Sequence, residues 1–276
     1  MTPVPAGAPK LVATDLDGTL LGPDGTVSAR AARAIAELTA LDVLVVLVTG
    51  RSPRRMAPVA SALGNTGLAI CANGAATLDL GTGDMIATQP IPAAPLRSII
   101  ARLRTRLPGI TFAVDTGTEL YHEPDYPRHR PKPGVFAVPG TQLYRQPAIK
   151  LLAHHPGIAA APLAARVQEL APTACEATYS SGKGVVEISA SGVHKGTALA
   201  LLCAERGIVP AEVVAIGDMP NDIPMLRWAG TGYAVANAHP EVLAVAEHRI
   251  PGNARDGVAQ LCAALVHAIC PRVPTS

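Results

Sequence analysis

The chain has 276 residues, enough for one large domain or two smaller ones with hydrophobic cores of their own. Hydrophobic residues make up 49% of it, which excludes an intrinsically disordered protein. The formal net charge of +2 and the aromatic content of 3% argue against nucleic-acid binding, which relies on a basic surface and on stacking rings.

The sequence also argues against a membrane or secreted protein. Its apolar runs are all shorter than the ~20 residues that a membrane-spanning helix needs, and residues 1–10 lack the basic and apolar regions of a signal peptide. The five cysteines are scattered, mostly within apolar runs, as reduced core thiols would be. We therefore expect a cytoplasmic protein, monomer or homodimer, with no membrane and no nucleic acid among its partners.

The first ninety residues alternate between predicted strands and helices. Strands are predicted at 11–14, 43–48 and 68–71, and helices at 28–39, with Ser28 as N-cap, and at 53–63. The strands are continuous apolar runs, which are typical of a parallel sheet covered on both faces. After the Asn73-Gly74 turn, a hairpin is predicted from 75–78 and 85–88.

From about residue 90 the pattern changes. Helices are predicted at 96–107 and 161–170, and strands at 111–114, 148–153, 174–179 and 185–189, while 123–139 is proline-rich and irregular. Residues 91–190 hold eleven Lys and Arg against seven Asp and Glu. This excess would suit an anionic small substrate, and a solvated surface without function would also explain it.

After residue 192 the alternation returns. Helices are predicted at 194–206, 223–228, 240–246 and 257–269, and strands at 213–216, 232–235 and 248–250. We therefore predict an α/β fold with a doubly wound, mainly parallel, Rossmann-like sheet. Residues 1–89 and 191–276 would form the core, and residues 90–190 an inserted α+β cap domain.

Asp15 and Asp17 directly follow the first predicted strand. Residues i and i+2 of an extended segment point to the same side, at the sheet edge where open α/β sheets bind ligands. Two adjacent carboxylates need a proton or a cation between them, and Mg²⁺ is the simplest choice. An EF-hand loop is excluded, because its fifth, sixth and twelfth positions would hold Thr19, Leu20 and Thr26. An ordinary turn remains the alternative.

Three further motifs follow predicted strands or begin a helix. They are Thr49-Gly50, Lys195, and the segment 217–222 that holds Asp218, Asn221 and Asp222. Together with the first motif they suit phosphoryl transfer, in which one carboxylate attacks phosphorus and another acid protonates the leaving oxygen. Further carboxylates would hold Mg²⁺, and a hydroxyl, turn amides and a lysine would bind the phosphoryl oxygens. Each motif taken alone also fits a purely structural role.

The four motifs, in this order around an insertion, resemble the haloacid dehalogenase superfamily. The similarity is to its Cof-type branch, which carries a large class IIB cap between the second and third motifs. The resemblance implies that Asp15 is the nucleophile and a metal ligand. It implies that Asp17 is the general acid and base, with its main-chain carbonyl on the metal.

The same resemblance implies roles for the remaining motif residues. Asp218 would be a direct metal ligand, and Asp222 would lie close to the metal or reach it through water. Thr49, Gly50 and Lys195 would bind the transferring phosphoryl group, and Asn221 would help to position the phosphate or its lysine.

Substrate specificity should come from the cap, because the core holds only the phosphoryl group. The candidates in or near the cap cleft are Arg51, Asn73, Tyr121, His122, Tyr126 and Lys183. Tyr121 and His122 could stack on a ring or bind sugar hydroxyls, although a core position would also suit Tyr121.

The resemblance thus implies a Mg²⁺-dependent phosphatase that acts through an aspartyl phosphate. The substrate would be a small phosphorylated metabolite, such as a sugar phosphate, flavin mononucleotide or pyridoxal phosphate. A sugar phosphomutase shares the same intermediate and is one alternative. A non-catalytic metabolite-binding regulator is another, although a binder has no use for a nucleophile beside an acid.

Overall fold

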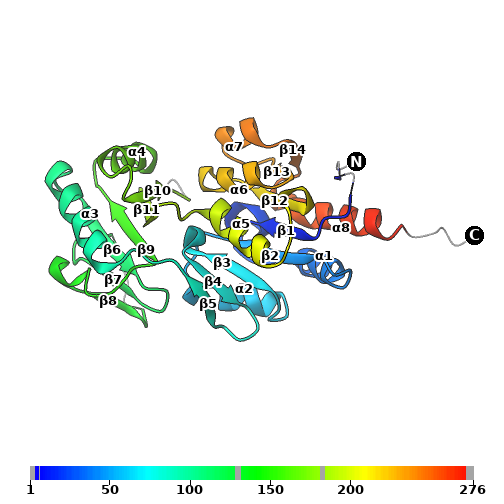
Figure 1. Cartoon of the computed structure of the whole chain (residues 1–276), viewed down its shortest axis with the longest axis horizontal. Helices are drawn as coiled ribbons and strands as arrows, with labels where there is room; N and C mark the ends of the chain where they lie inside the picture. The colour runs from blue at the N-terminus through cyan, green and yellow to red at the C-terminus, as the bar shows by residue number, and fades with distance from the viewer. Residues whose placement is uncertain (1–3, 6, 128–131, 181–183, 272–276) are drawn as a thin grey trace, which may run out of the picture.

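The computed structural model describes residues 4–5, 7–127, 132–180 and 184–271. Within these residues the chain forms two lobes that lie side by side (Figure 1). One lobe, here called the core, contains an eight-stranded sheet, and the other, here called the cap, contains a six-stranded sheet. All strands of the cap lie between residues 111 and 190, between the two groups of core strands. The predicted α/β fold with an inserted α+β cap is confirmed.

The core sheet is mainly parallel. Its strands, in spatial order, are β14 (His248–Ile250), β13 (Thr231–Val235), β12 (Val213–Gly217), β1 (Leu11–Thr14), β2 (Leu44–Val48), β3 (Leu68–Cys71), β4 (Ala76–Asp79) and β5 (Met85–Thr88). The six strands from β14 to β3 are parallel, and β4 and β5 add an antiparallel hairpin at one edge. Every residue of β1, β3 and β12 is buried, as the apolar strand sequences predict.

Helices cover this sheet. They are α1 (Ala29–Thr39), α2 (Ala57–Ala62), α5 (Lys195–Glu205), α6 (Ile223–Trp228), α7 (Pro240–Val245) and α8 (Gly257–Ile269). Helix α1 packs against α8, and α5 packs against α6. The first helix begins where the sequence predicts, because the Ser28 side chain accepts a hydrogen bond of 3.0 Å from the Ala31 amide.

The order of the core strands determines where a ligand can bind. After β1 the chain adds β2 and β3 on one side, and it later returns to add β12, β13 and β14 on the other. Such a reversal leaves a crevice at the carboxyl ends of the central strands. Asp15, Thr49 and Asp218 each come directly after β1, β2 or β12, so all three lie at this crevice.

The cap sheet is mainly antiparallel. In spatial order it contains β10 (Cys175–Thr178), β11 (Val185–Ala190), β9 (Lys150–His154), β6 (Thr111–Asp115), β7 (Leu120–His122) and β8 (Val135–Ala137). Helices α3 (Ala93–Arg106) and α4 (Ala160–Leu170) share one hydrophobic core with alternate strand residues such as Leu151 and Ile188. Because side chains alternate along a strand, Lys150, Leu152 and Glu187 lie on the opposite face.

The structure corrects two expectations about secondary structure. The helix predicted at 53–63 is divided into a short 3₁₀ turn, Pro53–Arg55, and α2. Pro58 has no amide hydrogen and fits only the first turn of a helix, so α2 begins at Ala57. The segment 123–139 is not wholly irregular, since it contains β8, which pairs with the unpredicted β7. Each of these strands has three residues, too few to show a period.

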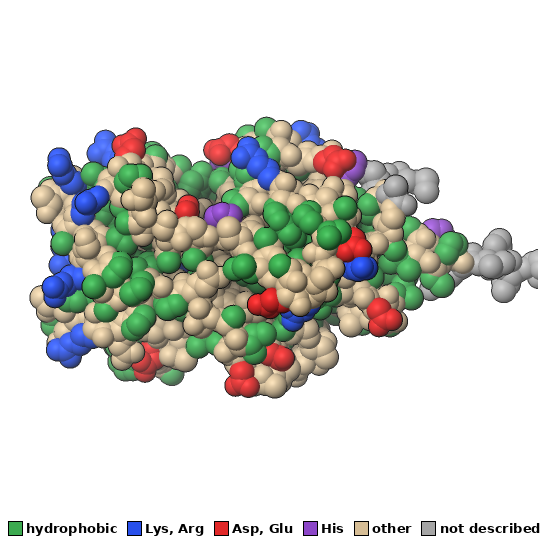
Figure 2. Space-filling model, viewed as in Figure 1, with side chains coloured by type: hydrophobic (Ala, Val, Ile, Leu, Met, Phe, Trp, Pro, Cys, Tyr) green, Lys and Arg blue, Asp and Glu red, His purple; other side chains and the backbone are tan. Residues whose placement is uncertain are grey.

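Charge is unevenly spread over the surface. On the face shown in Figure 2, most Lys and Arg side chains of the cap lie along its outer edge, where Figure 1 places α3. That part of the basic excess is a solvated surface and does not face the core. Among the described residues, no helix has both the length and the hydropathy that a membrane span requires.

The role of Ser28 as the N-cap of α1 can be tested by its contribution to stability. We expect Ser28→Ala to lower the free energy of unfolding by about 1 kcal/mol, because the Ala31 amide loses its acceptor. Urea denaturation would measure the change. Ser61→Ala, at an exposed position of α2, is the matched control and should shift stability by less than about 0.5 kcal/mol. Equal losses in both variants would contradict the capping role.

Candidate active site

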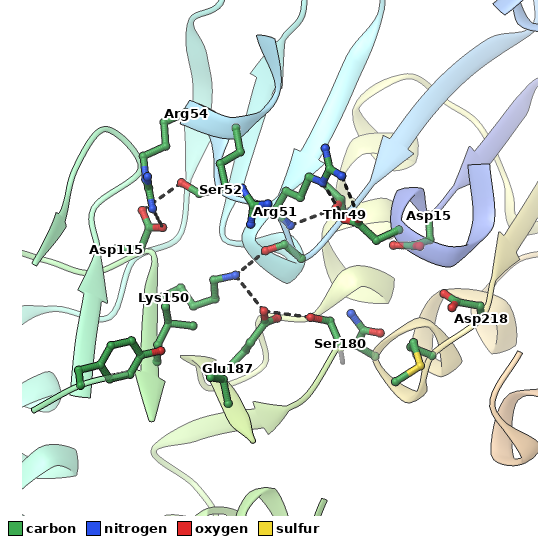
Figure 3. A pocket seen from close by; sticks show the side chains of 18 residues that line it. Asp15, Thr49, Arg51, Ser52, Arg54, Asp115, Lys150, Ser180, Glu187 and Asp218 are labelled. Carbon is green, nitrogen blue, oxygen red and sulfur yellow. Dashed lines mark hydrogen bonds and ion pairs between the residues drawn. The ribbon is translucent and has the colours of Figure 1, made fainter. Parts of the chain in front are cut away.

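A cavity of about 410 Å³ lies between the core and the cap. Figure 3 shows Lys150 and Glu187 projecting into it from cap strands, opposite Thr49 and Arg51 from the core. The residues that line it are Asp15, Asp17, Thr49, Gly50, Arg51, Ser52, Arg54, Arg55, Asp115, Tyr126, Lys150, Leu152, Ser180, Val185, Glu187, Asp218, Met219 and Asn221. Most of these side chains are polar or charged, so the cavity suits a polar ligand.

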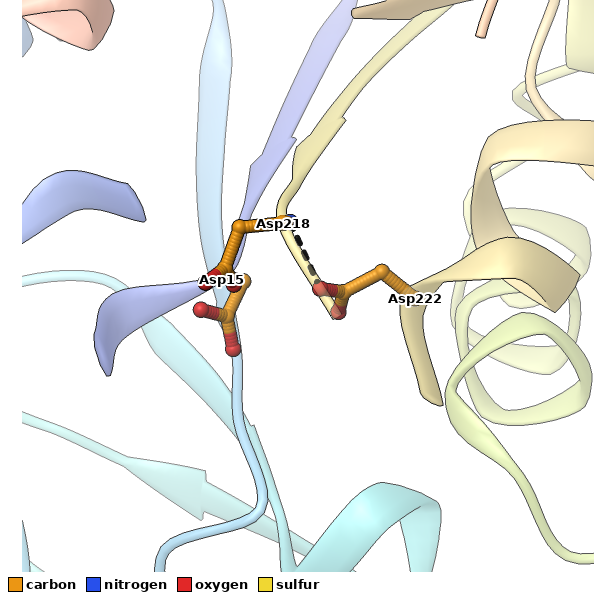
Figure 4. A group of neighbouring side chains, drawn as sticks. All are labelled: Asp15, Asp218 and Asp222. Atoms are coloured by element: carbon orange, nitrogen blue, oxygen red, sulfur yellow. Dashed lines mark hydrogen bonds between the residues drawn. The ribbon is translucent and has the colours of Figure 1, made fainter. Parts of the chain in front are cut away.

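Three buried carboxylates meet at the core side of this cavity. Asp15, Asp218 and Asp222 each offer an oxygen within 4.8 Å of the others. Asp15 and Asp218 extend from the ends of neighbouring strands, and Asp222 points toward them from the start of the next helix (Figure 4). Lys195, at the first turn of α5, contacts Asp15 at 2.7 Å and Asp222 at 2.5 Å. One ammonium group therefore pairs with two of the three buried acids.

Asp222 has a mainly structural position in this cluster. Its Oδ1 pairs with Lys195, and its Oδ2 accepts hydrogen bonds from the amides of Asp218 and Met219, at 2.9 and 3.0 Å. Both oxygens are thus engaged by the protein. The carboxylate of Asp222 consequently holds the loop that carries Asp218 and orients the lysine.

The other two acids are unusually hard to ionise. Burial raises the pKa of Asp15 to about 7, although Lys195 opposes the shift. Burial, together with repulsion from Asp15 and Asp222, raises the pKa of Asp218 to about 8. This excess of buried acids over cations, made only of hard oxygen donors, fits a divalent cation such as Mg²⁺.

Gly18 and Thr19 of the first motif pack directly against the Asp218 carboxylate. Gly18 has a φ of +88°, and a Cβ at this position would lie 2.3 Å from Asp218 Oδ2. Thr19 Oγ1 donates a hydrogen bond of 3.1 Å to Asp218 Oδ1. The turn therefore needs glycine for its backbone conformation and for the close approach of the carboxylate.

The Asp17 side chain pairs with Arg51 and is not part of the acid cluster. Arg51 donates two hydrogen bonds to its carboxylate, from Nε at 2.7 Å and from Nη2 at 2.6 Å. Burial alone would raise the pKa of Asp17, but the hydrogen bond and the charge of Arg51 outweigh it and lower the pKa. Of the four residues predicted as metal ligands, the structure groups the side chains of Asp15, Asp218 and Asp222. The Asp17 side chain pairs with Arg51, and the predicted contact of its main-chain carbonyl with the metal stays a prediction.

The residues predicted to bind phosphate lie around the same point. Thr49, Gly50 and Asn221 line the cavity, and Lys195 lies buried beneath Asp15. Thr49 is 1% exposed, and its Oγ1 accepts a hydrogen bond of 3.0 Å from the Arg51 amide. Its hydroxyl hydrogen therefore remains available to an anion in the cavity.

The residues predicted to confer specificity are divided. Arg51 and Tyr126 line the cavity, and Asn73 is buried next to it. Tyr121 stacks on Phe136, with ring centroids 5.5 Å apart, and donates a hydrogen bond to Glu119. His122 places Nδ1 2.8 Å from the Glu123 carbonyl oxygen. Neither Tyr121 nor His122 reaches the cavity, and Lys183 lies outside the described residues.

Several cavity residues were not predicted from the sequence, chiefly Asp115, Lys150 and Glu187. Asp115 and Lys150 are opposite each other on paired strands. Lys150 and Glu187 each interrupt a predicted apolar strand, and a charged residue there was the available signal. The sequence does not reveal that these charges face the core, because that depends on how the cap sheet packs.

Comparisons with known proteins place this site in context. A family model described as haloacid dehalogenase-like hydrolase matches residues 12–261. The pyridoxal phosphate phosphatase YbhA of Escherichia coli (strain K12) is 29% identical over 265 residues, covering 91% of this chain and 96% of YbhA. The 5-amino-6-(5-phospho-D-ribitylamino)uracil phosphatase YbjI of the same strain is 44% identical over 78 residues, covering 28% of this chain and 29% of YbjI. The match with YbjI thus extends over less than a third of either protein.

The fold has solved counterparts. The crystal structure of SMU.1108c from Streptococcus mutans UA159 superimposes with a TM-score of 0.81 at 22% identity, covering 92% of this chain and 98% of that one. The two lobes and their connection are therefore a known arrangement.

Substitution of Gly18 should disrupt the acid cluster. We expect Gly18→Ala to weaken Mg²⁺ binding by about tenfold or more, because the new Cβ displaces the Asp218 carboxylate. Calorimetric titration with Mg²⁺ would measure the effect. Gly25→Ala is the matched control, since Gly25 also has a positive φ but no atom within 4 Å of an added Cβ. Similar affinity in both variants would contradict the close packing at Gly18.

Mg²⁺ should stabilise the protein more strongly as the pH rises. Burial raises the pKa of Asp15 to about 7 and that of Asp218 to about 8, so both acids ionise at lower pH in the unfolded chain than in the folded protein. Without metal, the free energy of unfolding therefore falls as the pH rises from about 4 to about 8. A cation reverses this effect, because it binds the ionised carboxylates. We expect a Tm increase with Mg²⁺ that is small near about pH 5 and larger near about pH 8. A shift of the same size at both pH values would be incompatible with these pKa values.

Proposed function

Because this chain belongs to the haloacid dehalogenase-like hydrolase family, as its four motifs predict, we propose that it is a Mg²⁺-dependent phosphatase for small phosphorylated metabolites. The observation that carries the proposal is the position of Asp15. Its carboxylate lines the cavity and contacts the buried Lys195, next to Asp218 and Asp222. A carboxylate held in this way can attack a phosphorus atom in the cavity.

In the proposed reaction Asp15 is the nucleophile. One of its oxygens forms a bond to phosphorus while the bond between phosphorus and the leaving oxygen breaks, which gives an aspartyl phosphate. Water then attacks phosphorus and releases phosphate and free Asp15. Lys195 keeps the nucleophile in place, and the Thr49 hydroxyl donates a hydrogen bond to a phosphoryl oxygen.

Mg²⁺ would be held by the carboxylates of Asp15 and Asp218 and by the main-chain carbonyl of Asp17, while Asp222 orients the loop of Asp218 and the side chain of Lys195. When bound, the ion supplies positive charge that offsets the charge on the phosphoryl oxygens. We also propose the division into a core at 1–89 and 191–276 and a cap domain at 90–190, with the ion entirely on the core side.

Asp17 is the proposed general acid and base. It would protonate the leaving oxygen in the first step and accept a proton from water in the second. In the structure its pKa is lowered by the two hydrogen bonds from Arg51, which is unfavourable for an acid. The proposal therefore requires that Asp17 leave Arg51 when substrate binds, and an anionic oxygen of the substrate is a suitable replacement partner for Arg51.

The polar lining supports a small, hydrophilic substrate. Asp115, Lys150 and Glu187 of the cap and Ser52 of the core line the cavity, and their polar groups can form hydrogen bonds with hydroxyl or carbonyl groups. YbhA and YbjI, which this chain resembles, are named for pyridoxal phosphate and for 5-amino-6-(5-phospho-D-ribitylamino)uracil, both small phosphorylated compounds. We therefore propose phosphorylated metabolites of this size, sugar phosphates included, as the substrate class.

Replacement of the nucleophile is the test of this proposal. We expect Asp15→Asn to lower Mg²⁺-dependent phosphate release by more than about a thousandfold, because an amide does not attack phosphorus. A panel of phosphorylated metabolites and a generic aryl phosphate would serve as substrates. Asp42→Asn, at an exposed left-handed turn that asparagine tolerates, is the matched control and should keep wild-type activity. Substantial activity in Asp15→Asn would exclude the mechanism.

A further inference from the structure

A chain of hydrogen bonds crosses from the cap to the core beside the cavity. Glu187 Oε1, on cap strand β11, accepts from Lys150 Nζ at 3.3 Å and from Ser180 Oγ at 3.1 Å. Glu187 Oε2 accepts from Asn73 Nδ2 of the core at 2.5 Å. Asn73 Oδ1 in turn accepts from Asn221 Nδ2 at 3.0 Å. Asn73 and Asn221 are both buried, so the hydrogen bond between the two amides is shielded from water.

The chemistry of these groups determines the direction of each amide. An ionised carboxylate only accepts hydrogen bonds, so Asn73 must turn its NH₂ group toward Glu187. Its oxygen then faces Asn221, which must present its own NH₂ group in return. The carboxylate of Glu187 therefore determines which end of each of the two amides donates a hydrogen bond and which end accepts one.

The polarity matters because Asn221 lines the cavity. Its Oδ1 is buried and has no hydrogen-bond partner among the described residues. An unpaired buried acceptor is unfavourable, so the neighbours must hold the amide in this orientation. The NH₂ group carries two hydrogens and gives one to Asn73. The polar atom that Asn221 can offer to a ligand is therefore Nδ2, a donor.

We propose that Glu187 and Asn73 are positioning residues that fix the amide of Asn221 with its donor toward the phosphoryl site. The inference rests on the proposed phosphatase function and extends it to two residues that need not touch the substrate. It also links the cap to catalysis, because Glu187 belongs to a cap strand while Asn73 and Asn221 belong to the core. Lys150 reinforces the link by donating a hydrogen bond to the Gly50 carbonyl oxygen of the second motif.

An exchange of amide and acid tests this inference. In Glu187→Gln, Lys150 and Ser180 hold the oxygen of the new amide, so its NH₂ group faces Asn73 and both amides of the chain must reverse. In Asn73→Asp, two carboxylates lie next to each other and repel. The double variant Glu187→Gln/Asn73→Asp restores the original polarity, because the carboxylate introduced at position 73 would accept from the amide introduced at position 187 and from Asn221.

We expect each single variant to lower kcat/KM by about tenfold to about a hundredfold, and the double variant to recover to within about threefold of wild type. Inorganic phosphate binding in the presence of Mg²⁺, measured by calorimetry, should weaken and recover in the same order. The control pair is Glu169→Gln/Asn65→Asp, the same exchange at exposed positions away from the cavity, which should leave both quantities unchanged.

The outcomes separate this inference from the proposed function. Losses that simply add in the double variant would overturn the inference, and so would single variants with wild-type turnover and phosphate binding. A merely structural role would lower Tm in each variant without changing phosphate affinity per folded molecule. If the wild-type protein released no phosphate from any substrate, or if Asp15→Asn released it equally well, only the proposed function would be contradicted. The inference would still be tested by phosphate binding to the single and double variants, which does not require hydrolysis.

Discussion

The structure depends on one electrostatic constraint, the placement of three buried acids around a single lysine. Asp222 is fully engaged by Lys195 and by two amides, which leaves Asp15 and Asp218 with more negative charge than the protein balances. Burial without enough positive charge is unfavourable, and it raises the pKa of both acids. The fold maintains this arrangement because the acids follow adjacent strands of a buried parallel sheet. A cation is the most direct means of stabilising it.

The cap forms the other side of the cavity because successive side chains of its strands point to opposite faces of the sheet. Leu151 and Ile188 pack under the cap helices, so the neighbouring residues Lys150 and Glu187 must face the core. These two charged side chains pair with each other and reach the motifs of the core. The same contacts therefore connect the cap to the loops that carry the proposed catalytic residues. In the proposed phosphatase, the cap would thus do more than cover the substrate.

Much of the core could be predicted from sequence because its signals are local. The apolar strands, the Ser28 cap and the Asp15-x-Asp17 turn are each contained within a few residues, and the fold class followed from their alternation. The cap side of the site depends on distant pairings instead. Glu187 meets Asn73 across 114 positions, and Tyr121 turns to Phe136 because β7 pairs with a three-residue strand. No local pattern encodes such contacts.

The central claim is that these acids hold a cation beside a nucleophilic Asp15. A crystal structure of the protein with Mg²⁺ and beryllium fluoride, which mimics a phosphoryl group, tests it most directly. We predict one ion bound by Asp15 and Asp218, and a fluoroberyllate group bonded to the carboxylate of Asp15 within the cavity. An ion bound away from these acids, or a fluoroberyllate group attached to a different side chain, would contradict the claim.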